Sequence, residues 1–465
     1  MAETRGAVGS PARSVLRIAV PMLPADLVAV LVPLAVLALM GRIDGDAHYV
    51  RALFMPVQFL FLALIAGIGA SNQVAAAVAH GAEDLRGAGA ALRADARIAA
   101  GAGAAFSVLL IVSAPLLGHL MGVSETAREE FTGFLRAIAP ASALLLGPAL
   151  TAATLRGCGL ARQAAAVTLL AALTEIGGVA LLALGAGLGI AGVAPAVALS
   201  GLAGTALGWV LLRRAGLLGP AASAPGRPRP VPLRSAVRRL TAVGLPVGAS
   251  YLVICAANLV LMRILAPFGP TVQSGYAGAA TLQTLLIIPG LVLGSATAIV
   301  LNSHRGAGRS GLLSPTLHAG LRITAGAYAV LAVVSYAGRD LLAGVLSGDP
   351  QIAAETARYL QTVGLSYLLM GLVLAALTVL EQVGGGPAAL AMNAVYFVGA
   401  VAVGGRLAAD GGPDALYRTI AVFNGLGAVA VGVTVWFVRR LAARETSGAS
   451  APDTRPSTIL TGKGT

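Results

Sequence analysis

The sequence is poor in charge, in aromatic side chains and in cysteine. Only 11% of its 465 residues are charged and 5% are aromatic, whereas 57% are hydrophobic. Soluble domains carry about 25% charged residues, so this composition excludes an ordinary soluble protein. The two cysteines, Cys158 and Cys255, lie in unrelated segments. They form no metal motif, and we expect no disulfide between them.

Other absences exclude further classes of function. No G-x-x-x-x-G-K-[ST] motif occurs, so ATP hydrolysis by this chain is not expected. The net charge of +13 comes without the interleaved aromatic and basic residues of a nucleic-acid-binding surface, so we expect no nucleic-acid partner. The five histidines show no metal-ligand spacing. We therefore expect no metal, no cofactor and no catalytic residue.

Long apolar runs dominate the chain instead. Runs of about 20 apolar residues are long enough to cross a bilayer. We count twelve such runs and predict an all-α polytopic membrane protein of a bacterial cell membrane. The predicted spans are approximately 15–40, 51–78, 96–121, 129–155, 161–186, 190–213, 236–266, 272–302, 316–346, 352–381, 387–408 and 415–440.

Arginines gather in alternate loops and set the predicted orientation. They follow spans 2, 4, 6, 8 and 12, whereas the opposite loops hold most of the loop acids. By the positive-inside rule, both termini are cytoplasmic. The predicted domains are a cytoplasmic N-terminal segment at 1–14, an N-lobe at 15–213, a Pro- and Arg-rich cytoplasmic linker at 214–235, a C-lobe at 236–441 and a disordered tail at 442–465.

The two halves of the chain repeat with a constant offset of 225 residues. Residues 18–28 (IAVPMLPADLV) resemble 243–253 (VGLPVGASYLV), and LRGCG at 155–159 aligns with LEQVG at 380–384. Each half has six spans, an even number, so both halves enter the membrane from the same side. This pattern predicts a parallel repeat of two pseudo-symmetric six-helix lobes, with a cavity between them, as in one class of secondary transporters.

Several pieces of the sequence carry a family resemblance. They are IAVPM in span 1, GIGASNQVAAAVAHGAED in span 2, LRGCG after span 4, GLGIAGVAPAVALS in span 6 and GLPVGAS in span 7. In order and spacing they resemble the multidrug and toxic compound extrusion (MATE) family, of the multidrug/oligosaccharidyl-lipid/polysaccharide flippase superfamily. The resemblance covers residues 15 to 440. It implies two six-helix lobes in a V shape and the exchange of protons or sodium for a drug-like molecule or metabolite.

The ion-binding residues of the family do not carry over one by one. One branch has an acid in span 1 where this chain has Val36, and an Asn in span 5 where this chain has Glu175. The other branch has an acid in span 7 near Ile254. Glu175 is therefore the one acid at a matching position, and its residue type differs.

Two of the 19 acids, Asp26 and Glu175, are predicted to lie well inside the hydrocarbon region. An ionised Asp at a helix centre costs about 2.5 to 3.5 kcal/mol on insertion scales, so such acids usually face a cavity and carry function. We predict that both serve ion coupling. Asp26 has two interpretations: a displaced coupling carboxylate, or a solvated residue that gates the cytoplasmic mouth.

Prolines and neutral polar residues complete the candidate site. Pro24 and Pro33 interrupt the hydrogen bonding of span 1, and indicate either a hinge that reshapes the cavity or a static kink. Intramembrane polar side chains either line the cavity or connect helices. The residues predicted as candidates for the substrate cavity are Asn72, Gln73, Tyr251, Asn258, Arg263 and Gln283.

The leading hypothesis is a monomeric, cation-coupled antiporter that exports a small molecule by alternating access. Protons are favoured over Na⁺, because a hard cation wants several oxygen ligands and Glu175 is followed by Gly177, Gly178 and Val179. The alternative is a flippase of a lipid-linked or polysaccharide precursor, which an inward-facing Arg263 would favour. A membrane-embedded transferase is disfavoured, because no catalytic cluster of acids or His–Asp pair is present.

Overall fold

The structure, a computed structural model, describes residues 10–42, 45–120, 123–218 and 232–449, and all regular elements in these ranges are helical. The N-terminal half contributes six spans. α4 and α5 together form one of them, and α6 ends in a π-helical turn at Ala180–Gly185. Its helices are α1 (Pro11–Met40), α2 (Gly45–Gly81), α3 (Leu85–Leu120), α4 (Glu125–Leu144), α5 (Leu146–Gly157), α6 (Ala161–Val179) and α7 (Val193–Arg214).

The C-terminal half repeats this arrangement after the short helix α8 (Leu233–Arg239). The last apolar stretch, Pro350–Ser447, has 98 residues and is broken at Gly384 (φ 108°) and Gly412 (φ 70°). These positive φ angles need glycine, and they divide the stretch into three crossings. Its helices are α9 (Leu245–Leu265), α10 (Pro270–Gly306), α11 (Leu313–Ala337), α12 (Arg339–Leu346), α13 (Pro350–Val363), α14 (Tyr367–Leu380), α15 (Gly386–Leu426) and α16 (Ala428–Ala449).

The described residues therefore contain twelve crossings, as the sequence predicts. Ten apolar stretches are long enough to span a membrane, and the tenth holds three crossings. α16 continues to Ala449, so the first eight residues of the predicted tail at 442–465 are helical. The rest of that tail, residues 219–231 of the predicted linker and residues 1–9 of the predicted N-terminal segment lie outside the described residues.

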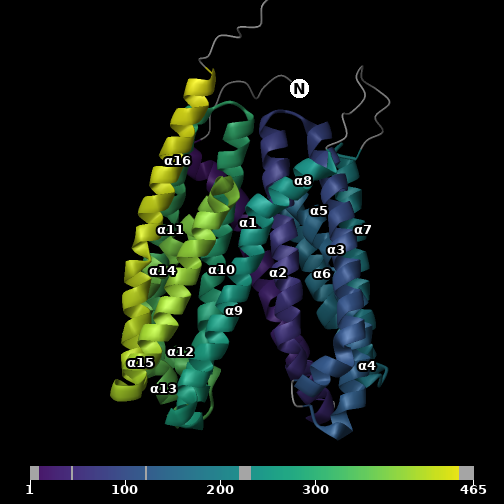
Figure 1. The fold of residues 1–465 in the computed structure, drawn as a ribbon, viewed down its shortest axis with the longest axis vertical. Helices are drawn as coiled ribbons and strands as arrows, with labels where there is room; N and C mark the ends of the chain where they lie inside the picture. The colour runs from purple at the N-terminus through teal and green to yellow at the C-terminus, as the bar shows by residue number, and fades with distance from the viewer. Residues whose placement is uncertain (1–9, 43–44, 121–122, 219–231, 450–465) are drawn as a thin grey trace, which may run out of the picture.

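The helices form two bundles that diverge along the long axis (Figure 1). α1 to α7 make one bundle and α9 to α16 the other, and α1 packs on α6 of its own bundle while also contacting α10 and α11 of the other. The bundles separate toward the end where α4, α12 and α13 lie, which we call the α4 end. The other end, where α8 lies and where α1 begins and α16 finishes, is the α8 end. The predicted fold class, two six-helix lobes, is confirmed.

Close glycine contacts hold the lobes together near the α8 end. A Cβ atom on Gly81 would lie 1.9 Å from the backbone oxygen of Ser303, and one on Gly306 would lie 2.0 Å from the oxygen of Val78. The two contacts are related by the offset of 225 residues, so α2 and α10 cross on the pseudo-symmetry axis. A second close approach joins the halves at Gly67 and Gly244. Small residues at such crossings let helix backbones touch.

Candidate functional site

A cavity of about 440 Å³ lies between the two lobes. We call it the central cavity. Its walls come from α1, α2, α4, α5, α6 and α7 of the first half and from α9, α10, α14 and the π-helical turn Glu381–Gly385 of the second. Both Arg51 and Gln73 on α2 line it, so it follows 22 residues of that helix, or ~33 Å. The cavity therefore runs through most of the thickness of a bilayer.

Asp26 lines the central cavity and is paired with an arginine that was not among the predicted site residues. Arg156, the penultimate residue of α5, places its Nη1 atom 3.5 Å from Asp26 Oδ2. Both side chains are partly buried. The pair ties α1 to α5 within the N-terminal lobe. Asp26 is thus neither unpaired nor fully solvated, because the Arg156 guanidinium lies beside it.

A second pair of opposite charges lies toward the α4 end of the central cavity. Glu175 on α6 is 8% exposed and Arg51 on α2 is 2% exposed, and both line the cavity. Arg51 donates to Gln58 Oε1 at 2.8 Å and lies 5.4 Å from the centre of the Phe54 ring. The carboxylate and the guanidinium make no direct ion pair among the described residues, although they line the same cavity.

A third carboxylate, Glu381, lines the central cavity from the C-terminal lobe. It accepts a 2.8 Å hydrogen bond from Ser250 Oγ, which in turn accepts one of 3.1 Å from Asn393 Nδ2. Tyr251 lines the same cavity as Glu381, Asp26 and Arg156. The cavity wall nearest the α8 end therefore carries two carboxylates, one guanidinium and one phenol.

The repeat explains this arrangement. Residues 26 and 156 correspond to residues 251 and 381 at the offset of 225. The N-terminal half places an Asp–Arg pair where the C-terminal half has Tyr251 and Glu381. The alignment of LRGCG with LEQVG contains this exchange of arginine for glutamate, and so the sequence held a signal for Arg156 and Glu381. The sequence holds no comparable signal for Arg51, because this arginine lies at the predicted start of span 2 and not inside the span.

Neutral amides close the central cavity between the lobes. Gln73 Nε2 donates to Ser295 Oγ at 2.8 Å and to Gln382 Oε1 at 3.0 Å, which joins α2 to two elements of the other half. Asn302 Nδ2 donates to the backbone oxygen of Gln382 at 3.0 Å. These groups and the glycine crossing at Gly81 seal the α8 side in this conformation.

The structure brings together Asp26, Glu175, Gln73, Tyr251 and Pro33 around the central cavity, but not the other predicted site residues. Asn72 is fully buried inside the N-terminal lobe, where it donates to Leu150 O and Thr154 Oγ1. Gln283 lines a separate pocket inside the C-terminal lobe. Asn258, Arg263 and Pro24 are exposed and line neither the central cavity nor that pocket. α1 runs unbroken through its three internal prolines.

A buried ion pair bridges the lobes at the α8 end. Arg239, the last residue of α8, donates from Nη2 to both carboxylate oxygens of Asp95 on α3, each at 2.8 Å. Asp95 is only 2% exposed. The pair has no counterpart at the positions 225 residues away, which are Ser14 and Gly320. It therefore fastens one lobe to the other outside the repeat.

We expect Asp95→Asn to destabilise this conformation. Removing one partner of a buried ion pair leaves the other charge uncompensated and costs about 3–5 kcal/mol. The matched control is Glu445→Gln, which breaks the more exposed Arg305–Glu445 pair, where a loss of about 0–1 kcal/mol is expected. Thermal unfolding of the purified variants measures both. Equal midpoints for the two variants would show that the Asp95–Arg239 pair does not hold the lobes.

Within residues 10–42, 45–120, 123–218 and 232–449, no group of three or more His, Cys, Asp or Glu side chains comes together to hold a metal ion. Cys158 and Cys255 are both free.

Two repeated six-helix lobes around a charged cavity at membrane depth define a membrane transporter. The sequence model of the MatE family matches residues 21–181 and 246–404, one segment in each lobe and together more than half of the chain. The chain belongs to the MatE family, as its sequence motifs indicate.

Individual relatives agree with this assignment. The chain is 28% identical over 383 residues to the probable multidrug resistance protein NorM of Deinococcus radiodurans, which covers 77% of this chain and 80% of that protein. The fold is similar to that of the Vibrio cholerae MATE transporter VcmN in its bent form, with a TM-score of 0.85, 16% identity, and coverage of 94% and 98% of the two chains. It is also similar to a MOP superfamily transporter from Pyrococcus furiosus, with a TM-score of 0.82, 19% identity, and coverage of 94% and 97%.

Proposed function

We propose that this protein exports an amphiphilic small molecule in exchange for protons, by alternating access of its two lobes. The observation that carries the proposal is that two carboxylates, Asp26 and Glu175, line one cavity at membrane depth together with two guanidiniums. A carboxyl group shielded from water exchanges a proton more readily near neutral pH than one in water. Its protonation would release the neighbouring arginine and change the charge of the cavity.

Protons fit this site better than Na⁺. Na⁺, like other hard cations, wants several oxygen ligands around it. Arg156 lies 3.5 Å from Asp26 Oδ2 and competes with a metal cation for that oxygen, and Arg51 lines the same cavity as Glu175. A proton needs only one oxygen, whereas Na⁺ needs several.

The arginines orient the transporter. Arg86, Arg93 and Arg97 begin α3, Arg213 and Arg214 end α7, and Arg439, Arg440 and Arg444 lie in the last part of α16, all toward the α8 end. By the positive-inside rule this end is cytoplasmic. The structure, closed at the α8 end, then represents the outward-facing state. Residues 15–213 and 236–441 would be the two bodies that rock about the crossing of α2 and α10.

The cavity charge favours a cationic or neutral substrate. Three carboxylates (Asp26, Glu175 and Glu381) and two guanidiniums (Arg51 and Arg156) line it, so the ionised cavity has a formal net charge of −1. Its remaining surface is mostly apolar. A planar organic cation suits such a site, because the cavity offers it both apolar contact and one unmatched negative charge.

The test is efflux of the cationic dye ethidium from proteoliposomes under imposed ion gradients. A pH gradient alone, acid on the side that receives the dye, is expected to drive efflux, and a sodium gradient alone is expected to give no more than a gradient of potassium. Efflux driven by the sodium gradient and insensitive to pH would overturn the choice of proton.

A lipid flippase is the second candidate, and one observation favours it: Arg51 and Arg156 face the cavity and could hold a phosphate. Arg263, whose inward orientation would have favoured it, is exposed and lines neither cavity. In the same proteoliposomes, dithionite quenching of a fluorescent anionic phospholipid measures transfer between leaflets. We expect no acceleration over protein-free vesicles, and an acceleration would favour the flippase.

A further inference from the structure

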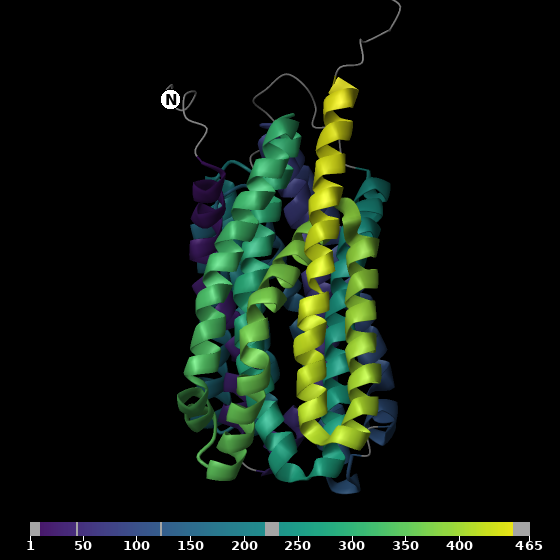
Figure 2. The same cartoon turned by 90° about the vertical axis from the view of Figure 1, so that its left-hand side faces the viewer.

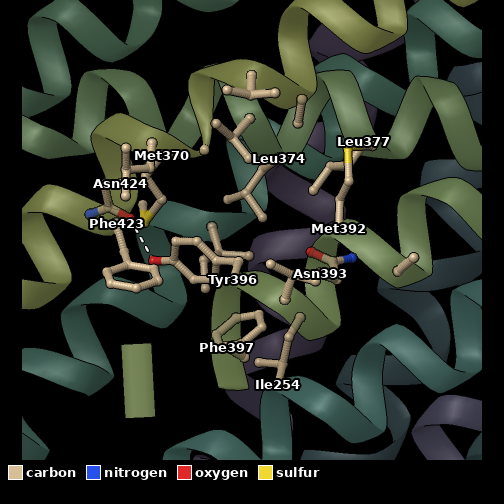
Figure 3. Close-up of a pocket in the computed structure, with 18 of the residues that line it drawn as sticks. Ile254, Met370, Leu374, Leu377, Met392, Asn393, Tyr396, Phe397, Phe423 and Asn424 are labelled. Carbon is tan, nitrogen blue, oxygen red and sulfur yellow. Dashed lines mark hydrogen bonds between the residues drawn. The ribbon is translucent and has the colours of Figure 1, made fainter. Parts of the chain in front are cut away.

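A second cavity, of about 410 Å³, lies inside the C-terminal lobe (Figure 3). We call it the lateral pocket. It shares no lining residue with the central cavity. On α10, Ile287 lines the lateral pocket and Ile288 the central cavity. On α14, Leu377 lines the lateral pocket and Thr378 lines the central cavity. These two helices therefore form a wall with a different cavity on each face.

The mouth of the lateral pocket opens on the outer surface of the lobe. Three of its lining residues, Val395, Leu426 and Val429, are 73%, 60% and 68% exposed. They lie on α15 and α16, and Figure 2 shows α16 (yellow) along the outer face of this lobe. Apolar side chains exposed at this depth of a membrane protein face acyl chains. A molecule dissolved in the bilayer can therefore reach the lateral pocket without entering the central cavity.

The chemistry of the lateral pocket differs from that of the central cavity. None of its lining residues carries a charge, and its polar groups are Gln283, Asn393, Tyr396 and Asn424. The rest of the wall is aliphatic, aromatic or thioether. An ionised ligand would lose its hydration here without gaining a counter-ion, which is costly. The pocket therefore selects against charged molecules.

Two of the polar groups retain hydrogen-bonding capacity. Tyr396 donates to Asn424 Oδ1 at 2.7 Å and Asn424 Nδ2 donates to Ser366, so this pair is satisfied (Figure 3). Asn393 Nδ2 donates to Ser250, but its Oδ1 atom has no hydrogen-bond partner among the described residues. Gln283 Nε2 reaches only the Met370 sulfur, at 3.7 Å. The pocket thus offers one free acceptor and one weakly used donor.

We propose that the lateral pocket binds a neutral, lipophilic small molecule that enters from the bilayer and hydrogen-bonds to Asn393 and Gln283. Its volume lies within the range of about 300–1,000 Å³ that holds drug-sized ligands. This site goes beyond the proposed function, which concerns the central cavity. The two are nevertheless linked, because Asn393 contacts Ser250 and Ser250 contacts Glu381. An occupant that hydrogen-bonds to Asn393 acts through this chain on a carboxylate of the central cavity.

The test is photolabelling of the full-length protein in phosphatidylcholine nanodiscs, with labelled peptides identified by mass spectrometry. The probe is a neutral benzamide that carries a trifluoromethyl diazirine. In the parent protein we expect labelling concentrated in residues 391–397 and 423–430. Ala391→Trp blocks the exposed mouth and is expected to lower this labelling about tenfold, the equivalent of ~1.4 kcal/mol. Val398→Trp, on the same outer face but outside the pocket lining, should leave it unchanged.

One further variant and one further probe test the proposal independently. Asn393→Leu removes the free acceptor without filling the pocket and should also weaken labelling. A probe with a trimethylammonium group in place of the amide should label both segments about tenfold less. Equal labelling by the two probes, or equal labelling of the Ala391→Trp and Val398→Trp variants, would overturn the proposal. Because this assay reads binding and involves no ion gradient, its failure is distinct from a failure of proton-coupled export.

Discussion

Glu175→Gln is expected to lower the rate of pH-driven efflux strongly while leaving the protein folded. Glutamine keeps the size and shape of the side chain but cannot carry the charge that alternates during transport. Glu175 is 8% exposed and lines the central cavity, as does Arg51. A coupling free energy of about 1–3 kcal/mol corresponds to roughly 5- to 150-fold. We therefore expect the initial rate of ethidium efflux under a pH gradient to fall within that range.

Glu355→Gln is the matched control. Glu355 is a similarly buried glutamate, at 9% exposure, and it accepts a 2.8 Å hydrogen bond from Tyr417. It lies on α13 at the α4 end and does not line the central cavity. Its substitution is expected to lower the melting temperature but to leave the dependence of efflux on pH unchanged. An undiminished pH-driven rate in Glu175→Gln would remove Glu175 from the coupling mechanism and leave Asp26 or Glu381 as the carrier.

Gly81→Val is expected to have the largest steric effect. Its Cβ atom would lie 1.9 Å from Ser303 O, and the clashing atom belongs to the backbone, so no side-chain rotation relieves it. A carbon–oxygen contact needs ~3.3 Å, which forces α2 and α10 apart by ~1.4 Å. Overpacking of this kind costs about 1–3 kcal/mol. We expect a lower melting temperature and a loss of efflux, because the closed contact at the α8 end can no longer form.

The repeat supplies an internal check on this prediction. Gly306→Val introduces the symmetry-related clash with Val78 O and should reproduce the phenotype of Gly81→Val. Gly432→Val serves as the control, since Gly432 is an exposed glycine of α16, and a Cβ atom added there would have no atom within 4 Å. If Gly81→Val and Gly306→Val transported and melted like Gly432→Val, the α2–α10 crossing would not be the point at which the lobes close.

The fold follows from the sequence because its determinants are local or repeat regularly. Spans are set by apolar length, and the offset of 225 residues predicts the two lobes without any knowledge of contacts. Gly81 and Gly306, which are separated by this offset, make equivalent close contacts in the structure. The chain reversal at Gly412 is also local, because its φ of 70° suits glycine.

The candidate site can be predicted from the sequence only in part, because it depends on which face of each helix points into the central cavity. Asn72 and Gln73 are neighbours on α2, yet one is buried within its lobe and the other lines the central cavity. Their side chains point about 100° apart, and only packing decides which of them faces the cavity. Arg156 is 130 residues from Asp26, and no local pattern predicts such a pairing. Asp26 and Glu175 could be singled out because their insertion cost marks them, whereas the pairing of Asp26 with Arg156 could not be predicted.

Proton movement driven by substrate tests the central claim most directly. Proteoliposomes that enclose a pH-sensitive dye are given an ethidium gradient, with no pH gradient and with the membrane potential clamped. The account predicts that protons move against the direction of ethidium in the parent protein and that this flux is absent in the double variant Asp26→Asn, Glu175→Gln. Ethidium transport without proton movement in the parent, or an unchanged number of protons per ethidium in the double variant, would contradict it.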